Sequence, residues 1–179
     1  MFPVLETERM KLREIVEEDA GDIFSCFSNE QVTRYYGQEP FVKVDQAKQM
    51  VHLFAKNYEE KRGIRWGMER KGTKGLIGTI GLNAWSPTHK RTEIGYEIHP
   101  DFWRKGYAKE AISEIVTYGL EELGLMRIGA VVFLENTASN ELLLKMGFQH
   151  EGVLKNYIHQ NGRSYDTNVY GLCKVVDKS

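Results

Sequence analysis

Apolar residues follow two spacings along this chain, and each spacing predicts a different kind of element. Apolar side chains at every third or fourth position predict helices, whereas shorter alternating or continuous apolar runs predict strands. Helices are predicted over residues 17–28, 45–60, 101–123 and 137–146. Strands are predicted over residues 5–16, 64–70, 76–85, 91–100, 127–134, 148–160 and 163–175. The resulting element order is βααβββαβαββ.

The connections between these elements predict one mixed sheet flanked by helices. Three strands follow one another across short turns from residue 64 to residue 100, which favours an antiparallel meander. The next helix lies between two strands and requires a parallel crossover. Asn161-Gly162, a strong hairpin signal, joins the last two strands. Because no repeat or linker interrupts the chain, residues 1–179 are expected to form a single α/β domain, or α+β, with a mixed central sheet.

The stretch from residue 101 to residue 111 has an unusual charge pattern for the start of a helix. Free N–H groups and the macrodipole make a helix N-terminus positive, yet Arg104 and Lys105 add two cations, and Gly106 follows them. A bound phosphate group would explain the cations, because helix N-termini bind anions. Gly106 would let a ligand approach the backbone closely, and Ala108 leaves the next turn uncluttered. The alternative is an exposed first turn with two solvated cations.

Composition and short motifs exclude several classes of protein. The net charge of −1 at pH 7 gives the chain as a whole no electrostatic attraction for nucleic acid or an anionic membrane, so any anion binding must be local. No apolar run reaches the roughly 18–20 residues that span a bilayer, and residues 1–11 lack the apolar core of a secretory signal. Neither GxxxxGK[ST] nor a GxGxxG at a strand-to-helix turn occurs. Cys26 and Cys173 are expected to be reduced thiols in a cytoplasmic protein, and the five histidines lack metal-ligand spacing, so no metal is expected.

Three segments of the chain resemble one known family. Residues 91–111, RTEIGYEIHPDFWRKGYAKEA, resemble the acyl-coenzyme A binding motif of the GNAT N-acetyltransferases. Residues 131–172, with ENTAS, KMGF and the C-terminal hairpin, resemble the RimJ/RimL-like branch of ribosomal-protein N-terminal acetyltransferases, as do residues 5–14. The resemblance implies a GNAT fold, in which two neighbouring strands splay apart to admit the cosubstrate acetyl-CoA.

The resemblance also assigns contacts with coenzyme A. Backbone amides of the loop and the helix start would hold the pyrophosphate, and this set comprises Trp103, Arg104, Lys105, Gly106, Tyr107, Ala108 and Lys109. Trp103 stands where the wider family has Arg or Gln, which favours a packing role for this side chain. The strand end from Glu97 to His99 would pair with the pantetheine arm through its backbone. Asn136 would hydrogen-bond that arm, Ser139 would lie near the thioester sulfur, and Lys145 would reach the outer phosphate or the adenine.

Acetyl transfer to an amine needs an oxyanion donor, an acid for the leaving thiolate and a base for the amine. A backbone N–H at the end of the strand before the loop, near Ile98, is expected to donate a hydrogen bond to the oxyanion. Leu143 stands where the wider family often has a Tyr acid, so Ser139 is the expected substitute. Glu93 and Glu97 share one face of a strand, and either carboxylate could take the amine proton. The alternative for each is a structural ion pair with a nearby cation.

Three further residues have open roles at this point. Tyr96 and Tyr157 could shape the acceptor pocket or pack in the core. Asp166 could be structural or could contact the acceptor amine.

The expected function is acetyl-CoA-dependent N-acetyl transfer to a primary amine, by direct transfer in a ternary complex. The acceptor is either a protein N-terminal α-amine or a small amine. The alternatives are transfer of a longer acyl group and a non-catalytic module that binds or senses coenzyme A, which the missing Tyr acid keeps open. The expected partners are acetyl-CoA and the amine, with no nucleic acid and no membrane, and the chain could be a monomer or a homodimer.

Overall fold

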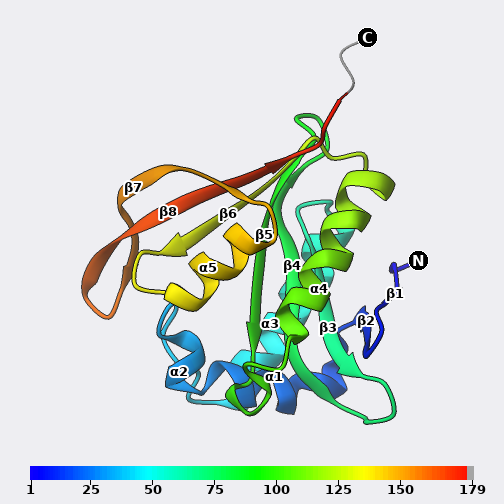
Figure 1. Cartoon of the computed structure of the whole chain (residues 1–179). Coiled ribbons are helices and arrows are strands. Elements are labelled where there is room, and N and C mark those ends of the chain that lie inside the picture. The colour runs from blue at the N-terminus through cyan, green and yellow to red at the C-terminus, as the bar shows by residue number, and fades with distance from the viewer. Residues whose placement is uncertain (177–179) are drawn as a thin grey trace.

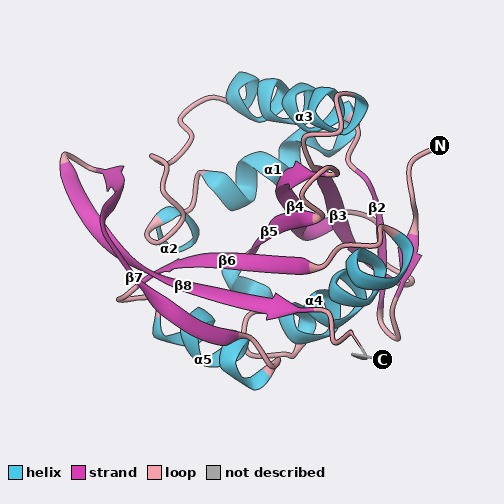
Figure 2. Ribbon diagram, turned by 90° about the horizontal axis from the view of Figure 1, so that it is seen from above, coloured by secondary structure: helices cyan, strands magenta, loops and turns pink. Residues whose placement is uncertain are grey.

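A central eight-stranded mixed sheet organises the structure, a computed structural model that describes residues 1–176. The strands lie in the order β1-β2-β3-β4-β5-β6-β8-β7. Helices α1 and α3 cover one face of the sheet, and α4 and α5 cover the other (Figure 2). The strands are β1 (Leu5–Glu6), β2 (Met10–Glu14), β3 (Ile64–Arg70), β4 (Leu76–Ser86), β5 (Arg91–Ile98), β6 (Arg127–Phe133), β7 (Gln149–Gln160) and β8 (Arg163–Cys173). The helices are α1 (Ala20–Phe27), α2 (Glu30–Thr33), α3 (Val44–Glu59), α4 (Tyr107–Thr117) and α5 (Thr137–Lys145).

The predicted fold class and element order are confirmed, but the single strand predicted over residues 5–16 is divided into β1 and β2, and α2 is an addition. β1 has two residues and α2 has four, and elements of that length carry too few positions to show a period. The helix predicted over residues 101–123 begins later, at Tyr107, because residues 100–102 form a 3₁₀ turn and Gly106 adopts a left-handed conformation. After Thr117 the chain continues through a π-helical turn, and Gly124, at a φ of 63°, ends it as predicted.

Strands β5 and β6 run parallel but separate soon after they begin. They pair only over residues 91–93 and 127–129, whereas β5 stays paired with β4 as far as Ile98 and β6 stays paired with β8 as far as Phe133. Figure 1 shows the two strands leaving a common end and diverging, with α5 beside the gap. Each strand therefore presents one unpaired backbone edge to the gap, as the resemblance implies.

The direction of the backbone groups along the free edge of β5 follows from its pairing with β4. The N–H of His99 donates to the carbonyl of Ile77 at the start of β4, at 2.8 Å. Because backbone groups alternate in direction along a strand, the N–H of Ile98 points the other way, toward the gap. Ile98 is therefore oriented as an oxyanion donor in the gap requires.

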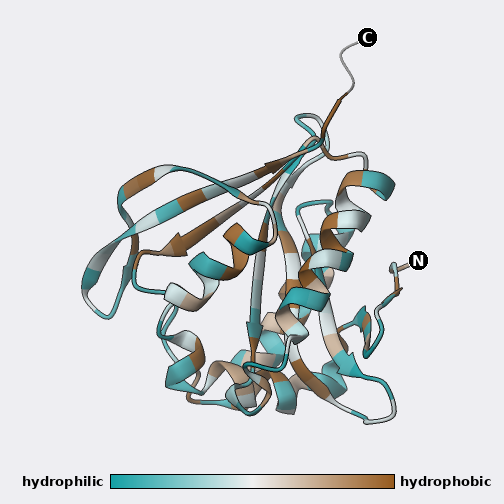
Figure 3. Cartoon of the chain, in the orientation of Figure 1, coloured by the Kyte–Doolittle hydropathy of each residue, from teal (hydrophilic) through white to brown (hydrophobic). Residues whose placement is uncertain are grey.

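Hydrophobic packing on both faces of the sheet holds the open strands in place. Between the sheet and helices α1 and α3 lies a cluster that includes Ile23, Phe27 and Val51. A larger cluster, with Trp66 and Ile112 fully buried, packs α4 against the sheet. Each long helix carries both hydrophobic and hydrophilic residues (Figure 3), which is the amphipathic pattern from which the helices were predicted.

Candidate functional site

A cavity of about 280 Å³ opens where β5 and β6 diverge, and we call it the splay cavity. Its walls come from both strands, from the segment after α2, from α5 and from β7. The lining residues are Tyr35, Tyr36, Asn83, Glu93, Ile94, Gly95, Tyr96, Ala130, Val131, Val132, Phe133, Asn136, Ser139, Leu143 and Ile158. Among these, Glu93 is the one charged side chain, so the cavity suits a cationic ligand.

The loop between β5 and α4 has the backbone geometry of an anion site. Arg104 and Gly106 both have left-handed backbone angles, with φ of 59° and 82°. Such a turn directs successive N–H groups toward one point, and the first N–H groups of α4 add to them. Gly106 is the N-cap of α4, and no side chain caps this helix end. The loop can therefore accept a phosphate oxygen without displacing a side chain, and this fits the pyrophosphate of coenzyme A.

Hydrogen bonds hold this loop against the end of β5. The indole N–H of Trp103 donates to the carbonyl of Ile98 at 2.6 Å, so Trp103 fastens the loop rather than packing in the core, and it stays 42% exposed. The ammonium of Lys105 donates to the carbonyl of Asp101 at 2.9 Å. Arg104 is exposed. Of the two cations that the sequence singled out, Lys105 is thus tied to the loop itself.

Arg9 is a third cation at this loop, and no sequence motif indicated it. Its guanidinium donates to the carbonyl of Lys105 at 2.9 Å and to the carboxylate of Glu110 at 2.7 Å. It also lies over the ring of Tyr107, 4.3 Å from the ring centre. Glu110 is 101 residues from Arg9 in sequence, so no local pattern could have indicated this contact. Arg9 places a positive charge beside Gly106, where a phosphate would lie.

The α5 side of the splay cavity carries a hydroxyl pair. The hydroxyl groups of Tyr96 and Ser139 lie 2.6 Å apart. Burial raises the pKa of Tyr96 above its ordinary value of 10, and the hydrogen bond with Ser139 offsets part of this effect. The side chain of Asn136 caps α5 by accepting from the N–H of Ser139 at 3.3 Å, which leaves its amide nitrogen for a ligand. Leu143, in place of a Tyr acid, is fully buried in the cavity wall.

The two candidate carboxylates share a face of β5, as predicted, but they have different surroundings. Glu93 lines the splay cavity, and among the described residues it makes no hydrogen bond and no ion pair. Glu97 is 5% exposed, and its two carboxylate oxygens bind the guanidinium of Arg65 and the hydroxyl of Thr79. Burial raises the pKa of Glu97, and the charge of Arg65 opposes this rise. Glu97 therefore forms the structural ion pair that the sequence left open for both residues.

Gly81 makes room for Arg65 on this face of the sheet. A Cβ on Gly81 would lie 2.5 Å from Cδ of Arg65, whereas one on Gly95 would lie 2.8 Å from the side-chain nitrogen Nδ2 of Asn83, so Gly95 makes room for Asn83. The guanidinium also donates to the hydroxyl of Tyr36 at 2.8 Å. The Arg65–Glu97 pair thus fixes Tyr36 as one wall of the cavity.

The open roles of Tyr157 and Asp166 are decided by the C-terminal hairpin. Tyr157 is 53% exposed, and Ile158 lines the cavity in its place. Asp166 accepts from the N–H of Asn156 at 2.8 Å and from the ammonium of Lys155 at 3.0 Å, and the first of these bonds is the main cause of its lowered pKa. Asp166 therefore holds a kink of β7 where Asn156 has a φ of 50°.

The remaining predicted contacts of coenzyme A lie at the edge of the site. Lys109 and Lys145 are exposed, on the first turn of α4 and at the end of α5. The ring of His99 accepts from the N–H of Asp101 at 3.2 Å, so it stabilises the 3₁₀ turn. Ala108 and Tyr107 are half-buried in the first turn of α4.

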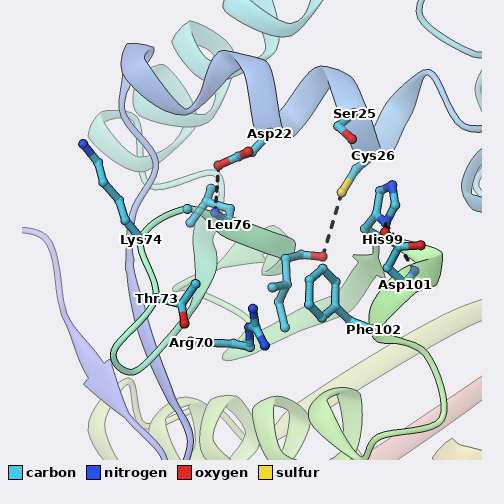
Figure 4. Close-up of a pocket in the computed structure, with 12 residues that line it drawn as sticks. Asp22, Ser25, Cys26, Arg70, Thr73, Lys74, Leu76, His99, Asp101 and Phe102 are labelled. Carbon is cyan, nitrogen blue, oxygen red and sulfur yellow. Dashed lines mark hydrogen bonds and ion pairs between the residues drawn. The ribbon is translucent and has the colours of Figure 1, made fainter.

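A second hollow, of about 250 Å³, lies between α1, the β3–β4 turn and residues 99–102 (Figure 4). The thiol of Cys26 points into it and donates to the carbonyl of Ile77 at 3.9 Å (Figure 4). Burial raises the pKa of Cys26 to about 12, so the group stays a neutral thiol near pH 7. Asp22 accepts from the N–H of Leu76 at 2.8 Å, which joins α1 to the start of β4.

The described residues carry neither a metal-binding cluster nor a membrane-spanning helix. Over residues 1–176, no cluster of three or more His, Cys, Asp or Glu side chains has an arrangement suited to a metal ion. Within the same residues, no helix combines the length and apolar character needed to cross a membrane.

The sequence matches known proteins over nearly its whole length. The family model described as an acetyltransferase (GNAT) domain matches residues 9–149. The uncharacterized N-acetyltransferase YoaA of Bacillus subtilis (strain 168) is 61% identical over 174 residues, which cover 97% of this chain and 98% of YoaA. Spermidine N(1)-acetyltransferase of Escherichia coli (strain K12) is 28% identical over 155 residues, covering 86% of this chain and 80% of that enzyme.

Solved structures show the same architecture. The crystal structure of a probable acetyltransferase has a TM-score of 0.86 at 26% identity and covers 96% of this chain and 97% of its own. RimL, the ribosomal L7/L12 alpha-N-protein acetyltransferase solved in complex with coenzyme A, has a TM-score of 0.85 at 17% identity, covering 96% and 98% of the two chains. At 17% identity the likeness to RimL shows the fold alone.

Proposed function

Because this chain belongs to the GNAT family of acetyltransferases, we propose that it transfers the acetyl group of acetyl-CoA to a primary amine in the splay cavity. The observation that carries the proposal is the gap between β5 and β6. It joins a loop with the backbone geometry of an anion site to a cavity whose one carboxylate has no partner among the described residues. Acetyl-CoA supplies the acetyl group as a thioester: a C–N bond forms as the C–S bond breaks, the amine loses one proton and the thiolate gains one. The named N-acetyltransferases among its relatives favour an enzyme over a non-catalytic module.

Coenzyme A would be held at two places along the gap. The N–H groups from Arg104 to Lys109 would bind the pyrophosphate. The guanidinium of Arg9, which is hydrogen-bonded to the carbonyl of Lys105, would add a positive charge beside it. The free edge of β5 would bind the pantetheine arm in the manner of an added strand. The N–H of Ile98, which points toward the gap, would donate to the oxyanion.

On the α5 side, Ser139 would donate a proton to the departing sulfur. The phenol of Tyr96, 2.6 Å from Ser139 and protonated at neutral pH, would return a proton to Ser139 and then regain one from solvent. On the opposite side of the cavity, Glu93 would hold the amine and accept its proton, directly or through water, because its carboxylate has no competing partner among the described residues.

The proposal is tested by measuring thiol release from acetyl-CoA with a panel of amines, including small diamines and peptides with free N-termini. Turnover on at least one primary amine is expected, with a rate that depends on the amine concentration. Binding of coenzyme A without turnover on any acceptor in the panel would contradict the proposal and favour a sensing module.

Removal of the Ser139 hydroxyl is expected to lower kcat about tenfold and to leave coenzyme A affinity unchanged. The effect is smaller than the roughly 10²- to 10⁴-fold that is typical of a general acid, since a thiolate leaves readily. Tyr96→Phe should lower kcat by a smaller factor, because Ser139 remains and only its proton source is lost. Steady-state kinetics of Ser139→Ala and Tyr96→Phe, with Ser113→Ala on the exposed face of α4 as the control, measure both effects. An unchanged kcat in Ser139→Ala would reduce this residue to a packing role.

A further inference from the structure

The side chain of Gln160, at the end of β7, is buried and fully hydrogen-bonded. It is 4% exposed. Its amide nitrogen donates to the carbonyls of Thr33 at 2.8 Å and Gln38 at 2.9 Å, and its oxygen accepts from the N–H of Gly37 at 3.1 Å. Thr33 is the last residue of α2, and Gly37 and Gln38 belong to the segment that follows it, more than a hundred residues from Gln160 in sequence. We call this set of three hydrogen bonds the clasp.

Two neighbouring contacts extend the clasp along the same segment. The N–H of Asn161 donates to the carboxylate of Glu39 at 2.8 Å. Gly37 has a φ of 86°, and a Cβ at this position would lie 3.2 Å from Cγ2 of Ile158. The hairpin and the segment from residue 33 to residue 39 are therefore in direct contact, with no space for another chain between them.

The clasp joins two walls of the splay cavity. Tyr35 and Tyr36 belong to the segment after α2, Ile158 belongs to β7, and all three line the cavity together with Glu93. The hydroxyl of Tyr36 also accepts a hydrogen bond from the guanidinium of Arg65. An acceptor that enters beside Glu93 thus meets a wall that is closed between Tyr36 and Ile158.

This closure separates the two classes of amine left open by the proposed function. A polypeptide N-terminus needs a groove that leads away from the cavity and holds the residues after the amine. A small amine needs only the cavity, whose volume of about 280 Å³ and single carboxylate suit a compact cation. We propose that the clasp restricts the acceptor to small cationic amines, and that Gln160 determines this specificity; the inference rests on the proposed function.

The test compares two acceptors, 1,5-diaminopentane and a ten-residue peptide with a free N-terminal serine and no lysine. Wild type is expected to have a kcat/KM at least tenfold higher for the diamine. Gln160→Met keeps the size of the side chain but removes all three hydrogen bonds, so the ratio should shift at least tenfold toward the peptide. The KM for the diamine should rise while its kcat changes less than threefold, because Gln160 touches no reacting atom. Gln149→Met, an exposed position at the other end of β7, is the matched control.

The outcomes separate this inference from the proposed function. If the wild-type protein prefers the peptide, the inference is overturned but amine acetylation is supported. This result does not depend on whether the Gln160→Met protein folds. An unchanged ratio in a Gln160→Met protein that still binds coenzyme A by calorimetry also overturns it. A wild type that acetylates neither these acceptors nor any other amine overturns the proposed function, and the inference falls with it.

Discussion

Replacing Gly106 with valine is expected to reduce the affinity for coenzyme A about 100-fold or more, which corresponds to roughly 2.7 kcal/mol. Gly106 has a φ of 82°, and a β-branched residue is strained there by about 1–3 kcal/mol. Its Cβ would also lie 3.2 Å from a guanidinium nitrogen of Arg9. Relief of either conflict turns the N–H groups of the loop away from the phosphate. Isothermal titration calorimetry with coenzyme A measures the effect.

Gly72 provides a matched control for this substitution. It lies in the β3–β4 turn with a φ of 79°, and nothing lies within 4 Å of a Cβ built there. Gly72→Val therefore carries similar backbone strain but should leave coenzyme A affinity unchanged. Arg104→Ala should weaken binding only a few-fold, because an exposed cation contributes little beside several backbone donors. Unchanged affinity in Gly106→Val would show that the loop is not the phosphate site.

The substitution Glu93→Gln is expected to lower kcat/KM for the amine by about 10² to 10³ at neutral pH, within the range for a general base. Glutamine keeps the shape of the side chain but neither attracts an ammonium group by charge nor accepts its proton. Because Glu93 makes no ion pair among the described residues, the melting temperature should change little. The affinity for coenzyme A should also stay the same, since the loop is untouched. Thiol-release kinetics, calorimetry and thermal melting test these three expectations.

Glu97 offers the sharpest comparison with Glu93, because the two residues share a strand face and differ in their partners. Glu97→Gln leaves the buried charge of Arg65 uncompensated, and breaking such a pair costs about 3–5 kcal/mol. Its main effect should be a lower melting temperature rather than a lower kcat in the protein that remains folded. Glu122→Gln, on an exposed turn, should change neither quantity. Equal kinetic losses in Glu93→Gln and Glu122→Gln would remove Glu93 from the mechanism.

The element order was predictable because each long element repeats its apolar spacing over several turns or pairs. Gly106 and the Asn161-Gly162 turn were predictable for a different reason: their backbone angles depend on the residues themselves. The roles of the charged residues were less predictable. The spacing of Glu93 and Glu97 puts both on one face, but it says nothing about a cation on β3 that reaches across β4 to only one of them.

The sequence by itself determined the family, the mixed sheet and the left-handed glycine that starts α4, because these depend on local pattern or on motifs of fixed spacing. The splayed strands followed from the resemblance to the family. Only the tertiary structure decided which carboxylate has no partner among residues 1–176, which cation lies beside Gly106 and which side chain ties β7 to the segment after α2. Arg65 and Glu97 are 32 residues apart, Arg9 and Glu110 are 101 apart, and Gln160 and Gly37 are 123 apart. Contacts over such separations depend on how the elements pack against one another. The type of one residue and its local spacing therefore cannot indicate which distant residue it will contact.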